Sequence, residues 1–128
     1  MTIAGIGSDI VRVERIRRLL EKYPSFTQRV FTPGEIAYCA GKADAAQSYA
    51  ARFAAKEAMM KALGTGWDRG VNFRDIEVAK GATGRPGIRL HGRAGEIRQE
   101  LGIGAIHLSL SHEREYALAF VVLELQKA

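Results

Sequence analysis

Cysteine is almost absent from this sequence, which has a single such residue, Cys39, among 128 positions. One cysteine cannot close an internal disulfide, and this count is typical of a reducing compartment, so we expect a cytoplasmic protein. No apolar run approaches the ~18 residues that cross a bilayer, so we expect no membrane span. The first residues show no basic segment ahead of an apolar one, and we therefore expect no signal peptide.

The composition is that of a globular protein with an excess of positive charge. Hydrophobic residues make up 47% and charged residues 26% of the 128 residues, so we expect one domain spanning residues 1–128. The 19 Lys and Arg against 14 Asp and Glu give a formal net charge of +5. That excess favours an anionic partner, which could be a nucleic acid, a phosphorylated small molecule or an acidic protein.

Helices are predicted where apolar residues repeat at intervals of three and four. Thr32, Pro33 and Glu35 form the pattern of a capping box with proline at the first helical position. Gly64 is placed to end the longest helix in a left-handed conformation. The predicted helices span about residues 13–23, 33–40, 48–63 and 93–101.

Strands are predicted where apolar and β-branched residues alternate or form short runs. The last two, AIHLSLS and YALAFVVLEL, flank a short connection and predict an antiparallel hairpin. Because strands and helices mix without a regular βαβ alternation, we predict an α+β fold. The predicted strands span about residues 2–11, 73–79, 87–92, 105–111 and 116–125, with a turn at 80–87.

The segment FAAKEAMMKALGTG, residues 53–66, carries charges among alanines and methionines. Ala50, Ala54, Glu57 and Lys61 are spaced by four, three and four residues, so they share one face of the predicted helix. Glu57 and Lys61 can be an ordinary surface ion pair that stabilises a helix by roughly 0.2–0.5 kcal/mol. The alternative is a ligand site, in which the small alanines leave room for something bulky. The spacing alone leaves both interpretations open.

Asp9 ends a hydrophobic strand, where a buried carboxylate needs a partner. It can be a turn or N-cap residue before the following helix, or it can be a metal ligand. One Asp from a strand and one Glu from a helix, such as Glu57, suit Mg²⁺, which takes one or two carboxylates beside water and phosphate oxygens. Lys61 could then hold a phosphate, and the backbone of residues 64–66 could approach the same anion.

Basic residues form a stripe on the first predicted helix. Arg15, Arg18 and Lys22 are three and four residues apart, on the side away from the apolar positions. Such a run is often only a solvated face, but it could also receive an acidic helix or a nucleic-acid backbone. No aromatic residues interleave with it and no nucleic-acid-binding motif accompanies it, which weakens the last option.

Taken together, three segments resemble the holo-acyl-carrier-protein synthases, the small group of 4′-phosphopantetheinyl transferases. The segments are GIGSDIVRVERI at 5–16, RFAAKEAMMKALGTG at 52–66 and HLSLSHEREYALAFVVLE at 107–124. The patterns G-x-D and F-x-x-K-E-A-x-x-K-A of that family are met without substitution at their defining positions. The resemblance implies the α+β fold of this family, with helices packed on a mainly antiparallel sheet.

The resemblance implies transfer of the phosphopantetheine arm of coenzyme A to a serine of apo-acyl carrier protein, with release of adenosine 3′,5′-bisphosphate. Asp9 and Glu57 match the Mg²⁺ ligands of the family, and Lys61 matches the lysine that neutralises charge on the phosphate. Glu57, directly or through a metal-bound water, is the expected base for the serine proton, with Asp9 as the alternative. Val11 stands where larger relatives carry a further acid, so only two protein carboxylates are expected at the metal.

The same resemblance implies contacts to coenzyme A and to the carrier protein. The residues expected at coenzyme A are Lys61, Gly64, Thr65, Gly66, Ser111, His112 and Arg52. Arg52 is five residues from Glu57, roughly 140° around the helix, so it would have to act from another face. Arg15 matches an arginine that meets the acidic second helix of the carrier protein, which agrees with the basic stripe. Family members are trimers with active sites between subunits and serve fatty acid biosynthesis.

Other classes of function compete with a Mg²⁺-dependent phosphoryl-transfer enzyme. A basic nucleic-acid-binding module would bind with a steep salt dependence and would not need Asp9. A non-catalytic domain that binds a carrier protein would keep Arg15 and not need Glu57. The intact set of acids and lysine argues against the second alternative, so we interpret Glu57 and Lys61 as catalytic and the alanines beside them as room for coenzyme A.

Overall fold

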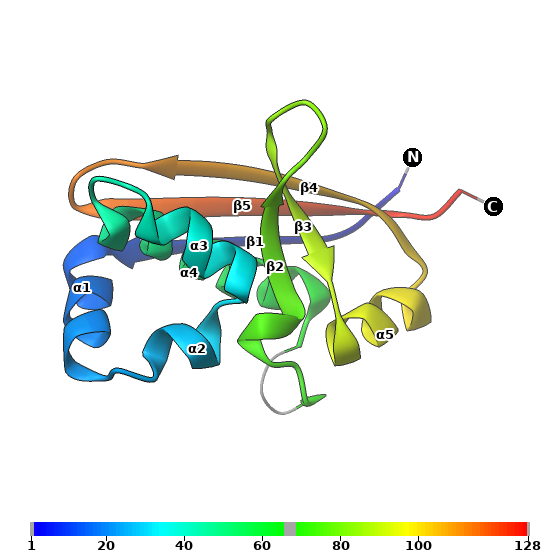
Figure 1. Ribbon diagram of the computed structural model, residues 1–128. Helices are drawn as coiled ribbons and strands as arrows, with labels where there is room; N and C mark the ends of the chain where they lie inside the picture. Colours follow the sequence, from blue (N-terminus) through cyan, green and yellow to red (C-terminus); the bar gives the residue numbers. More distant parts are fainter. Residues whose placement is uncertain (1, 66–68, 128) are drawn as a thin grey trace.

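A three-stranded antiparallel sheet and one long helix form the centre of the fold (Figure 1). The strands lie in the order β1 (Ile3–Arg12), β5 (Tyr116–Leu125) and β4 (Ile103–His112). The helix α4 (Ala45–Leu63) packs mainly on β1 and β5. Both chain ends lie at the same end of the sheet (Figure 1).

Smaller elements surround this centre in the computed structural model, which describes residues 2–65 and 69–127. The hairpin of β2 and β3 crosses the long strands, while α1 and α5 lie at opposite ends of the molecule (Figure 1). No helix within those two ranges is long and apolar enough to cross a bilayer. The remaining elements are α1 (Val13–Lys22), α2 (Phe26–Val30), α3 (Pro33–Ala40), the 3-10 helix η2 (Phe73–Asp75), β2 (Ile76–Lys80), β3 (Pro86–Leu90) and α5 (Gly92–Glu100).

The α+β prediction is confirmed, as are the main helix signals. Thr32 caps α3 through a complete capping box with Glu35, and Gly64 ends α4 with a φ of 69°. Three details were wrong. α4 begins at Ala45 rather than Ser48, because the side chain of Asp44 accepts the backbone N–H of Gln47. Residues 73–75 form η2 rather than the start of a strand, and the five-residue helix α2 was not predicted.

The backbones of β1 and α4 approach each other closely at two glycines. A Cβ atom added to Gly7 would lie 1.9 Å from the carbonyl oxygen of Ala58. One added to Gly5 would lie 2.2 Å from the carbonyl oxygen of Ala62. No side chain fits in that space, so the helix rests directly on the strand. This contact fixes the distance between α4 and Asp9, which follows two residues after Gly7 on the same face of β1.

The opposite face of the sheet is apolar and uncovered in the single chain. Ile6, Ile10 and Phe120 are 69%, 62% and 52% exposed. Ile6 and Ile10 are on the face of β1 away from α4, and Ser8 between them pairs with Phe120. Exposed apolar side chains gathered on one face are typical of an interaction surface.

Gly7→Ala should destabilise the protein, because its methyl group must push α4 away from β1. We expect the free energy of unfolding to fall by roughly 1–3 kcal/mol or more in urea denaturation. Gly87→Ala on β3 is the matched control, since a Cβ atom there meets nothing closer than 3.9 Å. Equal stability of the two variants would contradict the close approach.

Candidate active site

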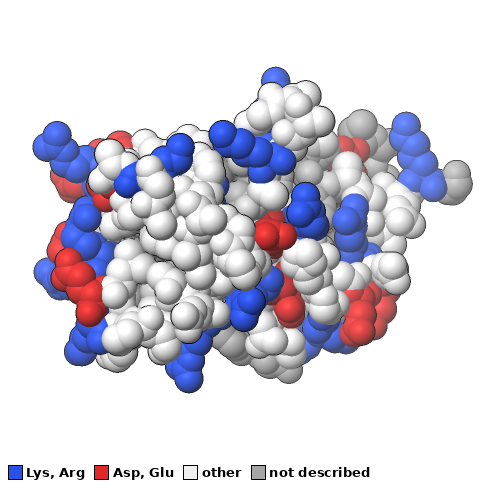
Figure 2. Space-filling view, in the orientation of Figure 1, with Lys and Arg blue, Asp and Glu red and all other residues white. Residues whose placement is uncertain are grey.

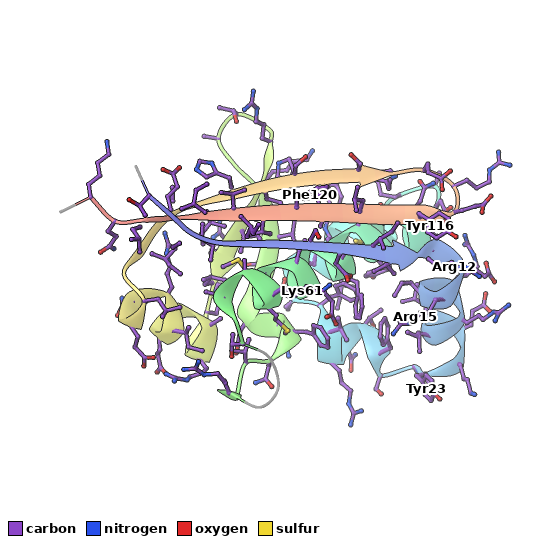
Figure 3. The ribbon with its side chains drawn as sticks, turned by 180° about the vertical axis from the view of Figure 1, so that it is seen from behind. Arg12, Arg15, Tyr23, Lys61, Tyr116 and Phe120 are labelled. Atoms are coloured by element: carbon purple, nitrogen blue, oxygen red, sulfur yellow. The ribbon has the colours of Figure 1, made fainter. Side chains whose placement is uncertain are left out.

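β1 and α4 bring a carboxylate and an ammonium together across 52 residues of sequence. Lys61 Nζ lies 3.2 Å from Asp9 Oδ1 and donates a hydrogen bond to the Ser8 carbonyl oxygen at 2.9 Å. The Asp9 side chain is 17% exposed, whereas that of Lys61 is 56% exposed. Figure 3 shows Lys61 on α4 close to β1, on the side of the molecule where the exposed face of the sheet is seen. Lys61 therefore remains accessible to a ligand while it is held by Asp9.

Glu57 lies one helical turn before Lys61 and close to Asp9. Burial, and then the negative charge of Asp9, raise the pKa of the Glu57 carboxyl above its ordinary value. The positive charges of Lys61 and Arg15 act in the opposite direction. A carboxyl held in this way releases its proton nearer to neutral pH, which is the property a general base needs.

The site is therefore more than an ordinary helix ion pair. Within the described part of the chain, the partner of Lys61 is Asp9 on β1 rather than Glu57 on its own helix. The role expected for the alanines was wrong, however. Ala50 and Ala54 are fully buried in the single chain, so they do not line a surface on which coenzyme A could lie. The close contact with β1 is made farther along α4, at Ala58 and Ala62.

Two carboxylates facing one another fit a hard divalent cation. Burial, and then the negative charge of Asp9, raise the pKa of Glu57, and a cation between the two carboxylates would relieve their repulsion. The position two residues after Asp9 offers no further carboxylate, because it is Val11, which is apolar and 2% exposed. No group of three or more potential metal-ligating side chains occurs in the described ranges. This donor set suits Mg²⁺, which keeps most of its water, rather than zinc.

A separate cationic pocket lies between α3, α4 and the β2–β3 hairpin. It has a volume of about 210 Å³, and its lining includes Tyr38, Ser48, Arg52, Lys80 and His112. Arg52 is 8% exposed and its guanidinium carbon lies 4.0 Å from the centre of the Tyr38 ring. Among the described residues, the buried Arg52 Nε has no hydrogen-bond partner. An anionic ligand would complete this pocket.

This pocket brings together two of the residues expected at coenzyme A, Arg52 and His112. It does not contain Lys61, which instead borders a surface pocket with Ser8 and Phe120. Ser111 is exposed beside His112 on β4. In one chain, the residues expected at coenzyme A are thus divided between two sides of α4.

The end of α4 is ordered by its own backbone. The Gly64 N–H donates to the Lys61 carbonyl oxygen, and the Thr65 N–H donates to that of Met60 at 3.0 Å. The Thr65 hydroxyl is buried and has no partner within the described ranges. Gly66, also expected at coenzyme A, lies outside the described residues.

The basic stripe of α1 borders a shallow groove. Its lining includes Arg15, Arg18, Leu19, Lys22 and Tyr23. Figure 2 shows basic side chains around α1 with acidic ones among them. The stripe is therefore less uniform than predicted, because Glu14 pairs with Arg18 at 3.7 Å. The Lys22 ammonium also lies 5.5 Å from the Tyr23 ring.

Sequence reasoning missed the cations that surround Tyr38. Lys42 and Lys80 lie 4.4 and 5.4 Å from the centre of its ring, in addition to Arg52. Burial would raise the pKa of the Tyr38 hydroxyl, but the hydrogen bond and charge of Lys42 and the charge of Arg52 bring it below its ordinary value. These residues come from three segments, so no local pattern in the sequence marks them as a cluster.

Comparison with known proteins identifies the family to which this chain belongs. The family model of the 4′-phosphopantetheinyl transferase superfamily matches residues 5–121. The chain is 50% identical over 123 residues to the holo-[acyl-carrier-protein] synthase of Solibacter usitatus (strain Ellin6076), covering 95% of this chain and 98% of the relative.

Solved structures agree across nearly the whole chain. The holo-[acyl-carrier-protein] synthase of Neisseria meningitidis superposes with a TM-score of 0.87 at 40% identity, covering 96% of this chain and 99% of the other. The Helicobacter pylori holo-[acyl-carrier-protein] synthase in complex with coenzyme A gives a TM-score of 0.80 at 34% identity, covering 93% and 99%. The chain is therefore a transferase that belongs to the 4′-phosphopantetheinyl transferase superfamily.

Proposed function

We propose that this protein, acting as one domain over residues 1–128, transfers the 4′-phosphopantetheine arm of coenzyme A to a serine of apo-acyl carrier protein. The products are holo-acyl carrier protein and adenosine 3′,5′-bisphosphate. The observation that carries the proposal is the meeting of Asp9 from β1 with Glu57 and Lys61 from α4. The complexes of relatives with coenzyme A support the same substrate.

In the proposed reaction, the serine oxygen forms a bond to the phosphorus that carries the pantetheine arm. The bond from that phosphorus to the bridging oxygen breaks, and adenosine 3′,5′-bisphosphate leaves with the electron pair. Glu57 takes the serine proton, for which its raised pKa suits it, with Asp9 as the alternative base. The exposed ammonium of Lys61 stabilises the negative charge that develops on the leaving phosphate.

Asp9 and Glu57 are the residues that would hold Mg²⁺. When bound, the ion would supply charge stabilisation to the pyrophosphate as a Lewis acid. The two carboxylates leave most of its coordination to water and substrate oxygens, as this ion prefers.

The far end of coenzyme A carries one phosphate, the 3′-phosphate of its adenosine, whose charge suits the cationic pocket at Arg52. Arg52 and His112 would bind it there. Lys61 and residues 64–66 would bind the pyrophosphate. Because these groups lie on two sides of α4 in one chain, we propose a homotrimer whose active sites lie between subunits. The apolar face with Ile6, Ile10 and Phe120 is the surface available for that assembly.

The acidic carrier protein would dock on the groove of α1 through Arg15, Arg18 and Lys22. Arg15 is close enough to influence the pKa of Glu57, so a serine on a bound carrier would arrive beside the proposed base. In the cell we place the reaction in the cytoplasm and in fatty acid biosynthesis, with neither nucleic acid nor membrane as a partner.

The direct test is the intact mass of apo-acyl carrier protein after incubation with this protein, coenzyme A and Mg²⁺. We expect the carrier to gain one phosphopantetheine group, and to gain none when EDTA is present. Glu57→Gln and Asp9→Asn should keep the fold, by circular dichroism, and lower the rate roughly 10²- to 10⁴-fold. No mass gain with several carrier proteins, from folded wild type, would contradict the proposal.

In the protein without Mg²⁺, Glu57 should titrate above its ordinary pKa of 4.5, because burial and then the negative charge of Asp9 raise that pKa. NMR of the carboxyl carbon follows this titration. The cation of Arg15 lowers the pKa of Glu57, so Arg15→Gln should move the titration to higher pH.

Arg18→Gln is the matched control for this shift. It removes an equal charge from the same groove, but its side chain is 79% exposed and does not act on Glu57. We expect Glu57 of this variant to titrate as in the wild type. Equal shifts in both variants would show that the charge of Arg15 does not act specifically on Glu57.

The assembly can be tested by light scattering coupled to gel filtration. We expect a mass three times that of the 14.0 kDa chain. Phe120→Arg should give the single chain, because a charge cannot be buried in an apolar interface without a partner. Tyr23→Arg, at an exposed position just after α1 and off the sheet, should keep the mass of wild type.

A further inference from the structure

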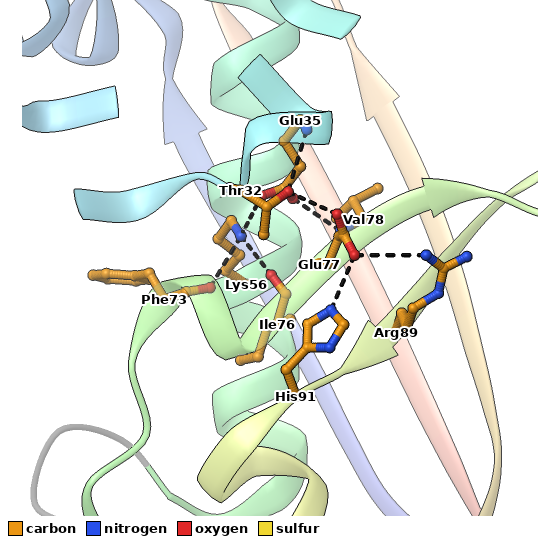
Figure 4. Close-up of polar contacts among 9 residues, drawn as sticks. All are labelled: Thr32, Glu35, Lys56, Phe73, Ile76, Glu77, Val78, Arg89 and His91. Carbon is orange, nitrogen blue, oxygen red and sulfur yellow. Dashed lines mark hydrogen bonds and ion pairs between the residues drawn. The ribbon is translucent and has the colours of Figure 1, made fainter. Parts of the chain in front are cut away.

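Lys56, the residue before Glu57, is charged but has no part in the proposed chemistry. Its side chain is fully buried on the side of α4 that faces α3 and β2. Its ammonium donates to Glu35 Oε1 at 2.8 Å and to the Phe73 carbonyl oxygen at 3.0 Å, and it also contacts the Ile76 carbonyl oxygen (Figure 4). All three hydrogens of the ammonium are thereby used.

This arrangement costs free energy that an apolar side chain would not require. Burial lowers the pKa of Lys56 from its ordinary value, against the opposing charge of Glu35. Replacing a buried ion pair by hydrophobic residues is often neutral or stabilising, so core stability alone does not explain a lysine here. An ammonium, unlike an apolar side chain, makes directional hydrogen bonds. Here its three hydrogen bonds fix the Lys56 nitrogen relative to α3, η2 and the start of β2.

The partners of Lys56 are themselves held in place. Glu35 Oε1 also accepts the Thr32 N–H at 2.9 Å, and its Oε2 accepts the Val78 N–H at 2.9 Å (Figure 4). The carboxylate is fully buried and belongs to the capping box of α3. Lys56 is therefore anchored to the start of α3 and to the start of β2, which are both rigid elements.

The helix that carries Lys56 has no single apolar face to define its rotation. Eight of the 19 residues of α4 are alanine, and buried residues occur on all its sides. Such a helix lacks the apolar stripe that normally sets which face points inward, so specific contacts such as those at Gly5 and Gly7 and at Lys56 must set it. A shift by one residue position is a rotation of about 100°, so a modest rotation would carry Glu57 and Lys61 away from Asp9.

We propose that Lys56 is a positioning residue: its three-point anchor on Glu35, Phe73 and Ile76 fixes the rotation of α4 and so aims Glu57 and Lys61 at Asp9. This inference rests on the proposed function for its kinetic consequence, but its structural consequence can be measured independently. The alternative is that Lys56 contributes only to stability.

Three variants separate the two roles. Lys56→Met leaves Glu35 unpaired and should lower both the unfolding midpoint and kcat. Lys56→Met combined with Glu35→Gln removes both charges and keeps a side-chain oxygen that accepts the Thr32 N–H, so it should recover part of the midpoint. Ile97→Ala in α5, a fully buried site in another element, is a destabilised control that should keep kcat when assayed below its unfolding midpoint.

The double variant decides between the two roles. We expect its kcat to stay roughly 10- to 100-fold below wild type, since small misplacements of catalytic groups have effects of this size. The KM for coenzyme A should rise as well, because Arg52 and Lys61 are on the same helix and move together when it rotates. In a crystal structure of this variant, Lys61 Nζ should leave its position 3.2 Å from Asp9 Oδ1.

Recovery of kcat together with stability, with the Asp9–Lys61 contact unchanged, would overturn the positioning role. If wild type transfers no phosphopantetheine while the double variant still displaces Lys61, the proposed function fails and the positioning role stands. A double variant with normal kcat but a displaced Lys61 would also overturn the inference, because position would then not govern the rate.

Discussion

The buried ammonium of Lys56 and the carboxylate of Glu35 hold together the segments on which the proposed site depends. Neither group is exposed, and each bonds to backbone groups of further segments. Removing one partner of such a pair typically costs ~3–5 kcal/mol, because a charge is left uncompensated in the interior. On its other side α4 rests on the backbone of β1 at Gly5 and Gly7. The helix is thus held between a hydrogen-bonded anchor and a close backbone contact.

This constraint explains how an alanine-rich helix can present charged groups at defined places. Consecutive side chains of α4 point into different surroundings: Lys56 into the interior, and Glu57 toward Asp9. Arg52 lies on the side of the β2–β3 hairpin, beside Tyr38. Binding groups therefore lie on more than one side of a single helix. In the proposed trimer, coenzyme A meets one set on each of two copies of the chain, which links the exposed face of the sheet to the chemistry.

Local patterns in the sequence were sufficient for most of the fold. The capping box of α3, the glycine that ends α4 and the final hairpin each depend on residues close together in the chain. The start of β2 was mistaken because Phe73 alternates with its neighbours as in a strand, whereas Asn72 and Asp75 cap a short 3-10 helix there. In the site, the motifs located Asp9, Glu57 and Lys61 but not their mutual contacts. The bonds of Lys56 and the cations around Tyr38 join distant segments, and such contacts leave no periodic signal.

The most direct measurement is a crystal structure of this protein with coenzyme A and Mg²⁺ bound. The account predicts a metal held by Asp9 and Glu57, with the pyrophosphate at Lys61. It also predicts the far phosphate against Arg52 and His112 of a neighbouring copy. Coenzyme A bound away from these residues, for example in the groove of α1, would contradict the central claim that α4 and β1 form the transfer site.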